Sequence, residues 1–142
     1  MANTYATELA GQTSTPVDKL LSSTQGATER VFRATITMAS QASGDTITLA
    51  RVPKGYRFSR GVITASATMG AAATIAIGTA ASSAKYRAAA VFTAVDTPTM
   101  FGKTTGIDAA KLTAEETVIA TIAAASLPAS GTVVIELVYI KA

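Results

Sequence analysis

The segment from Thr132 to Ile140 decides the fold class, and it reads Thr-Val-Val-Ile-Glu-Leu-Val-Tyr-Ile. Most of these residues are β-branched or aromatic, and such side chains favour strands because they pack well on a pleated surface. Successive side chains of a strand point to opposite faces, so here Glu136 is the one charged residue on two largely apolar faces. We therefore expect a strand that lies in the centre of a sheet or is covered by another subunit.

Earlier segments show the alternation of apolar and polar residues that is typical of half-buried strands. Between Val31 and Met38, the even positions are apolar, while Arg33 and Thr35 stand between them. Turn-forming Gly, Pro, Ser and Asp residues separate the successive segments. The sequence therefore predicts an all-β domain over residues 30–142, a β-sandwich or jelly roll of about seven to eight strands. The expected strands are 31–38, 46–52, 62–69, 74–78, 86–92, 117–123 and 132–140.

Residues 1–29 differ from the rest of the chain because they are rich in Thr, Ser, Gln and Gly. Large apolar residues are sparse there, so this segment cannot build a core alone. Two interpretations are equally open: an extended N-terminal arm that gains order on a partner, and a partly disordered terminus. The apolar residues that such an arm offers to a partner are Leu9, Val17, Leu20 and Leu21.

The stretch from Thr93 to Lys111 is expected to be a long connection with one short helical turn around residues 107–112. Directly after it, residues 113–116 fit a helix capping box. The β-branched residues that follow, Val118 and Ile119, favour a turn into a strand instead.

The composition excludes most kinds of active site. The chain contains no His and no Cys, so it lacks the usual general base near neutral pH, the commonest metal ligand and the thiolate nucleophile. No disulfide framework is possible, which is compatible with synthesis in a reducing compartment. We expect a protein that is not an enzyme and that binds no metal or cofactor.

The uncharged segment 61–84 is long enough to cross a membrane. Its residues are mostly weakly apolar or polar, and its large side chains alternate as in strands, so we expect no membrane span. The first residues lack the basic start and continuous apolar stretch of a secretory signal. The formal net charge of +3 is a mild excess that selects no partner by itself.

Two short motifs resemble functional signatures but lack their companions. Residues 82–85, Ser-Ser-Ala-Lys, have the Ser-x-x-Lys spacing of penicillin-recognising enzymes, without the Ser-Asp-Asn motif that accompanies it. Residues 102–104, Gly-Lys-Thr, resemble the end of a phosphate-binding loop, but Thr97 replaces the first glycine of that motif. The acidic neighbours Glu115 and Glu116 point to opposite faces of a strand and so make no acid-base pair. We expect solvated turns at both motifs.

The densest cationic cluster consists of Arg51, Lys54, Arg57 and Arg60, with Tyr56 and Phe58 between them. In a hairpin, such a cluster could present aromatic rings and positive charge to single-stranded nucleic acid. The favoured interpretation places the arginines in solvent or against acidic groups of a partner, with the two rings at the sandwich edge. We therefore do not expect nucleic acid to be the partner.

Several phrases of the sequence resemble small virion proteins of tailed bacteriophages. They are Val-Phe-Arg-Ala-Thr-Ile at 31–36, Ala-Ile-Gly-Thr-Ala-Ala at 76–81, Lys-Tyr-Arg-Ala-Ala-Ala at 85–90 and Gly-Thr-Val-Val-Ile at 131–135. Together with the polar N-terminal segment, they are similar to the capsid cement, or decoration, proteins of short-tailed phages, including that of a Bordetella phage. The resemblance implies a jelly-roll or sandwich body that ties adjacent major capsid subunits together on the outside of the capsid. It implies no catalytic residues.

On this resemblance, the chain is expected to be made in the host cytoplasm and to become part of the virion exterior. Its expected partner is the major capsid protein, and the candidate contacts are the apolar arm residues named above and the cluster Arg51, Lys54, Arg57 and Arg60. A second expected partner is another copy of the chain, as a homodimer because two-fold closure is the commonest symmetry. The candidate self-association residues lie on the second apolar face of the last strand, at Val134, Val138 and Ile140.

Two alternatives remain open at this point. Another head or tail component of a phage would share the same composition. A carbohydrate- or receptor-binding module is also compatible with a sandwich, with Tyr5, Tyr56 and Tyr86 as exposed rings that stack on sugars. The absence of Trp counts against the second alternative.

Overall fold

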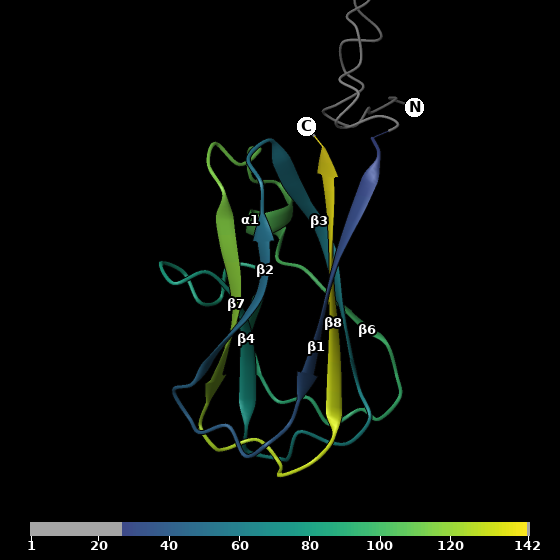
Figure 1. The fold of residues 1–142 in the computed structure, drawn as a ribbon, viewed down its shortest axis with the longest axis vertical. Helices are drawn as coiled ribbons and strands as arrows, with labels where there is room; N and C mark the ends of the chain where they lie inside the picture. Colours follow the sequence, from purple (N-terminus) through teal and green to yellow (C-terminus); the bar gives the residue numbers. More distant parts are fainter. Residues whose placement is uncertain (1–26, 142) are drawn as a thin grey trace, which may run out of the picture.

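The computed structural model describes residues 27–141, and this part of the chain folds into two four-stranded sheets (Figure 1). One sheet has the strand order β1-β8-β3-β6 and is called the β8 sheet below; the other has the order β2-β7-β4-β5 and is called the β7 sheet. All neighbouring strands within them are antiparallel. The strands are β1 (Glu29–Thr37), β2 (Thr46–Val52), β3 (Tyr56–Ala65), β4 (Thr74–Gly78), β5 (Arg87–Ala90), β6 (Thr99–Phe101), β7 (Glu116–Ala123) and β8 (Thr132–Lys141), and one short helix, α1, spans Thr104–Ile107.

The connections define a jelly roll. Only β4 and β5 are consecutive strands that lie in the same sheet, so every other connection crosses from one sheet to the other. Figure 1 shows the strands of both sheets running along the long axis of the molecule. This is the eight-stranded, double-sheet arrangement of a jelly roll. The predicted all-β sandwich fold is confirmed.

The core lies between the two sheets and follows the alternation that the sequence predicts. Strand β8 is central, between β1 and β3, and its inward residues Val133, Ile135, Leu137 and Tyr139 are fully buried. Opposite them, Val118, Ala120 and Ile122 of β7 are also fully buried. On β1, the even positions face the core, and Ile36 is 5% exposed. A central strand therefore needs no second subunit to cover its inner face.

Two predicted boundaries are wrong for physical reasons. Strand β3 begins at Tyr56 rather than near 62, because a bulge at Ser59 breaks its period-two pattern. The expected loop of residues 93–111 contains the short strand β6, and its helical turn ends at Ile107 instead of starting there. Strand β6 has only three residues, too few for an alternation to be visible.

The turn expected at residues 113–116 does lead into strand β7, as the β-branched residues predict. The proposed arm residues Leu9, Val17, Leu20 and Leu21 lie outside the described residues. Strand β1 starts at Glu29, the last residue of the predicted arm. In the part of the chain described by the structure, no helix is long and apolar enough to cross a membrane.

Candidate functional site

A polar centre lies at one end of the sandwich, where β7 begins. The side chain of Glu116 accepts hydrogen bonds from the Lys85 ammonium and the Tyr86 hydroxyl. The Glu116 side chain is 14% exposed and that of Lys85 is 28% exposed, so this ion pair is largely shielded from water. The pair joins the loop between β4 and β5 to the start of β7, which is consistent with a structural role.

The geometry of the β4–β5 loop brings Lys85 and Tyr86 to this position. The Ser82 carbonyl accepts hydrogen bonds from the amides of Thr79 and Lys85, at 2.9 and 3.1 Å. The Tyr86 amide then returns to β4 and donates to the Ile77 carbonyl at 2.9 Å. The loop therefore folds back tightly over Gly78, the last residue of β4.

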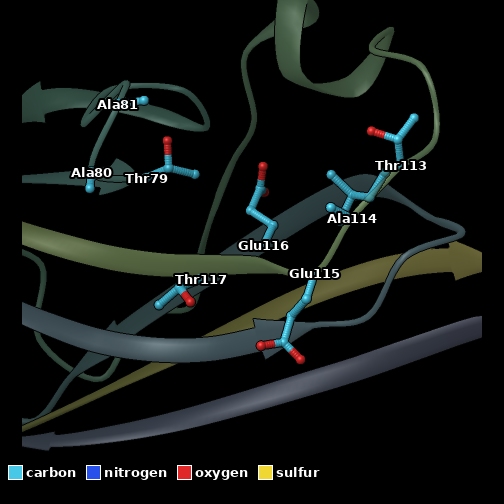
Figure 2. Close-up of a pocket in the computed structure, with 9 residues that line it drawn as sticks. Thr79, Ala80, Ala81, Thr113, Ala114, Glu115, Glu116 and Thr117 are labelled. Atoms are coloured by element: carbon cyan, nitrogen blue, oxygen red, sulfur yellow. The ribbon is translucent and has the colours of Figure 1, made fainter.

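An open hollow of about 400 Å³ lies beside this centre. Figure 2 shows that Glu116 points toward the Thr79–Ala81 side of the hollow, whereas Glu115 points the opposite way. The two carboxylates therefore do not face a common substrate, as their adjacent positions predict. Both oxygens of Glu116 already accept hydrogen bonds within the chain. Among the described residues that line the hollow, no hydroxyl is hydrogen-bonded to a side-chain base.

Five aromatic rings pack together next to this centre. Phe58 lies 4.2 Å from Tyr86 between ring centroids, and Tyr139 contacts both rings in edge arrangements. Phe32 joins the cluster through Tyr139 and Tyr56. Burial raises the pKa values of both Tyr86 and Tyr139 above the ordinary tyrosine value. The Tyr139 hydroxyl oxygen is buried beside the Tyr86 hydroxyl, but it reaches hydrogen-bond geometry with none of residues 27–141.

We expect the stability of the protein to fall steeply in alkali because of these two tyrosines. In the unfolded state both tyrosines ionise near pH 10, whereas in the folded state they keep their protons. Their contribution to the free energy of unfolding is therefore complete below about pH 10 and decreases as the pH rises above it. Above pH 10, the free energy of unfolding is expected to fall by about 1.4 kcal/mol per pH unit for each tyrosine. Urea unfolding between pH 8 and pH 11.5 measures it.

The variant Tyr139→Phe separates the two contributions. Its alkaline slope is expected to be about half that of the parent chain, because one titrating group is gone. At pH 7, its free energy of unfolding is expected to stay unchanged or to rise by about 1 kcal/mol, because an unpaired buried hydroxyl is removed. An unchanged alkaline slope would contradict the assignment of this effect to Tyr139.

The two sequence motifs form no reactive arrangement. Lys85 of the Ser-x-x-Lys motif contacts Glu116, and the motif lies in a turn rather than on a helix. Lys103 precedes the four-residue helix α1 and makes no side-chain capping bond. Within residues 27–141, no group of three or more acidic side chains gathers as a metal site would require.

The cationic cluster of the sequence is divided in the fold. The turn at residues 53–55 crosses between sheets and is not a hairpin, so Arg51 lies on the outer face of the β7 sheet. The bulge at Ser59 places both Arg57 and Arg60 on the outer face of the β8 sheet, since they pair with Ile140 and Val138. Lys54 is exposed in the turn. The four residues therefore form no continuous positive surface.

Two of these arginines already have acidic partners within the chain. Arg60 forms a bidentate pair with Glu29, at 2.6 and 3.1 Å, and this contact lowers the pKa of Glu29. Arg57 lies 3.5 Å from Asp108. Phe58 is 3% exposed and belongs to the core. The hairpin that would present rings to nucleic acid does not form.

The outer face of the β8 sheet carries exposed apolar side chains among its charged residues. Val31 is 57% exposed and Met100 is 66% exposed; half-buried Val62 pairs with Met100, and Glu136 lies next to Val62 on the same face. Of the candidate self-association residues, Val134 and Ile140 are half-buried, whereas Val138 is 4% exposed. Val138 therefore contributes little accessible surface, because its neighbours on β1 and β3 cover it.

The outer face of the β7 sheet is different, because threonines dominate it. The cross-strand pairs Thr46 with Thr121, Thr48 with Ile119 and Arg51 with Thr117 define this face. This contrast between the two sheets is not predicted from the sequence. The exposed position of Val31 follows from the alternation on β1, but Met100 lies in a strand too short to recognise.

The expectation that Tyr86 is an exposed sugar-stacking ring is wrong. Tyr86 is 1% exposed because the aromatic cluster covers it, and Tyr56 is half-buried. Tyr5 lies outside the described residues. The carbohydrate-binding alternative therefore loses one of its three candidate rings.

Comparisons with known proteins find similarity only at the level of structure. No protein-family model matches the chain, and no curated protein matches its sequence. A chain in the capsid asymmetric unit of cyanophage Pam1 is similar with a TM-score of 0.66 and 17% identity, over 82% of this chain and 86% of that one. A chain in the capsid of Ralstonia phage GP4 has a TM-score of 0.64 and 18% identity, over 81% and 85%. A chain in the capsid of the Helicobacter pylori bacteriophage KHP30 has a TM-score of 0.59 and 13% identity, over 80% and 88%. At these identities, the similarity establishes a shared fold.

Proposed function

We propose that this chain is a structural protein of a phage virion that binds the outer surface of the capsid and joins adjacent major capsid subunits. The observation that carries the proposal is the shared jelly roll: three phage capsids each contain a chain that matches about four fifths of this one. The matches also cover more than four fifths of those chains, so the correspondence concerns whole domains.

The polar centre supports a structural role rather than catalysis. Glu116, Lys85 and Tyr86 satisfy one another, and such a largely buried network fixes the relative positions of β4, β5 and β7. The chain has no His or Cys to supply the usual reactive groups. A module of this kind acts through its surfaces and through the number of copies that bind.

The proposed capsid contacts are of two kinds. The N-terminal segment would bind along a joint between subunits through its apolar residues Leu9, Val17, Leu20 and Leu21. Its loss of conformational entropy would be offset by the contacts that form on binding. Arg51 and Lys54 are exposed and form no ion pair with the described residues, so they are open to acidic groups of the capsid. Arg57 and Arg60 are the weaker candidates, since each already forms an ion pair with an acidic residue of the same chain.

We expect the chain to sediment with capsids assembled from the major capsid protein of the same phage, and to raise the temperature at which they open. Deleting residues 1–24 is expected to lower the copy number per capsid and to remove most of this heat resistance. Circular dichroism of the variant controls for folding. Unchanged occupancy would overturn the role of the N-terminal segment, and failure of the full chain to bind any shell would overturn the cement function.

A matched pair of variants tests the cationic contacts. The double variant Arg51→Glu and Lys54→Glu is expected to weaken capsid binding about tenfold or more, because like charges across an interface repel. Arg51→Lys with Lys54→Arg keeps both charges and is expected to bind like the parent chain. Equal binding by both double variants would remove these residues from the interface.

A further inference from the structure

Strand β1 is the free edge of the β8 sheet. It is nine residues long and pairs with β8 on one side, and no described residue forms a ladder with it on the other side. A long edge strand with unpaired amides and carbonyls is a template for another strand, unless charges, proline or a bulge block it. Residues 29–37 contain no proline, and their register with β8 is unbroken. Their three charged residues, Glu29, Arg30 and Arg33, include both signs, so a second copy can pair with them rather than be repelled.

The hydrogen bonds at both ends of β1 identify which residues point to the free edge. The Lys141 amide donates to the Thr28 carbonyl at 3.4 Å, and the Met38 amide donates to the Gly131 carbonyl at 2.8 Å. Antiparallel pairs alternate, so the even residues of β1 bond to β8 and the odd residues point away from it. At the far end, the Gln41 side chain already donates to the Thr37 carbonyl. The free donors and acceptors are therefore those of Glu29, Val31, Arg33 and Thr35.

We propose that β1 pairs antiparallel with β1 of a second copy about a two-fold axis at Val31. This pairing joins two β8 sheets into one continuous eight-stranded sheet. It goes beyond the proposed capsid role, because it requires no capsid. An isologous contact of this kind uses the same residues on both copies.

Charge complementarity selects this register. With the axis at Val31, Glu29 of one copy faces Arg33 of the other, and the exposed valines meet at the centre. Each ladder of charges then alternates in sign: Arg60 and Glu29 of one copy are followed by Arg33 and Glu136 of the other. The ion pair between Arg33 and Glu136 is long, with 3.9 Å between its nearest atoms, and both side chains are exposed. Arg33 can therefore contact a second acidic partner.

The neighbouring register is disfavoured for two reasons. An axis at Arg33 would bring two arginines together, and like charges directly opposite one another are destabilising. It would also pair Glu29 with Thr37, whose carbonyl Gln41 already occupies. The Val31 axis avoids both conflicts.

The variant Val31→Pro tests the backbone pairing without touching the bonds to β8. Proline is tolerated on an edge strand where the missing amide faces solvent, so the monomer is expected to stay folded. In sedimentation velocity at tens of micromolar, the parent chain is expected to be a dimer and Val31→Pro a monomer. The matched control Val31→Ala keeps the amide and is expected to retain the dimer, with a dissociation constant raised about tenfold or less.

Cysteine cross-linking tests the register, and the absence of native Cys makes the result direct. Residues that face one another in an antiparallel hydrogen-bonded pair have Cα atoms about 5.5 Å apart, which a disulfide can bridge. Val31→Cys is therefore expected to give covalent dimers on oxidation. Two copies of Arg33→Cys would be about 14 Å apart and are expected not to cross-link.

A monomeric parent chain, or a dimer that survives Val31→Pro, would overturn the proposal. So would cross-linking through residue 33 in place of residue 31. Protection of the Val31 amide from hydrogen exchange in a monomeric chain would mean that another segment covers the edge, such as residues 1–26. Capsid binding by a monomeric Val31→Pro chain would leave the cement function intact, so the two proposals fail independently.

Discussion

Replacing Gly78 with alanine is expected to lower the free energy of unfolding by about 3 kcal/mol, at the upper end of the cost of overpacking a core. Gly78 ends β4, and a Cβ atom there would overlap the Ser82 carbonyl oxygen and lie 2.7 Å from the Lys85 amide nitrogen. These are backbone atoms of a loop held by its own hydrogen bonds, so they cannot move aside cheaply. Urea unfolding at pH 7 measures the effect.

Gly102→Ala is the matched control for this prediction. A Cβ atom at Gly102 would lie 3.0 Å from the Cδ1 atom of Ile107, the far end of a flexible and partly exposed side chain. We expect a loss of about 1 kcal/mol or less, because the isoleucine can rotate away. Equal losses for the two variants would contradict the rigid-loop explanation.

Glu116→Ala is the second substitution with a large expected effect. It removes the acceptor of both Lys85 and Tyr86 and leaves an ammonium group and a hydroxyl without their partner. Breaking a fully buried ion pair costs about 3 to 5 kcal/mol, and the 28% exposure of Lys85 places this case near 3 kcal/mol. Thermal unfolding should show a decrease in Tm of about 10 °C.

The neighbouring residue provides the control. Glu115 is exposed and points away from the pair, so Glu115→Ala is expected to change stability by less than about 0.5 kcal/mol (Figure 2). Glu116→Gln should fall between the two, because its amide oxygen still accepts from Tyr86 but no longer carries a charge opposite Lys85. A Glu116→Ala chain as stable as the parent would show that the centre is dispensable for folding.

The alternation of the sequence was sufficient to predict the fold class and the inner faces of several strands. Residues 132–140 and 31–38 have the same orientation in the structure as their pattern predicts, because side-chain period depends only on local backbone geometry. The same principle predicted that Glu115 and Glu116 diverge. Strand β3 was placed wrongly, since one extra residue at the bulge reverses the faces that follow.

The candidate contacts were harder to judge from sequence. Arg51, Lys54, Arg57 and Arg60 are close in the chain, and only the crossing between sheets separates them in space. The acidic partners of Arg60 and Arg57, Glu29 and Asp108, are distant in sequence. Whether any of these residues contacts a capsid stays a prediction.

By itself, the sequence determined the all-β class, the alternation of each long strand and the lack of the residues that most active sites use. The tertiary structure decided which strands became neighbours, and with that the burial of Tyr86, the cover over Val138 and the partners of Glu116. The reason is physical: periodicity arises within a few consecutive residues, whereas strand pairing joins segments far apart in the chain. The free edge of β1 is therefore a property of the assembled sheet, although Val31 and its alternating neighbours were visible in the sequence from the start.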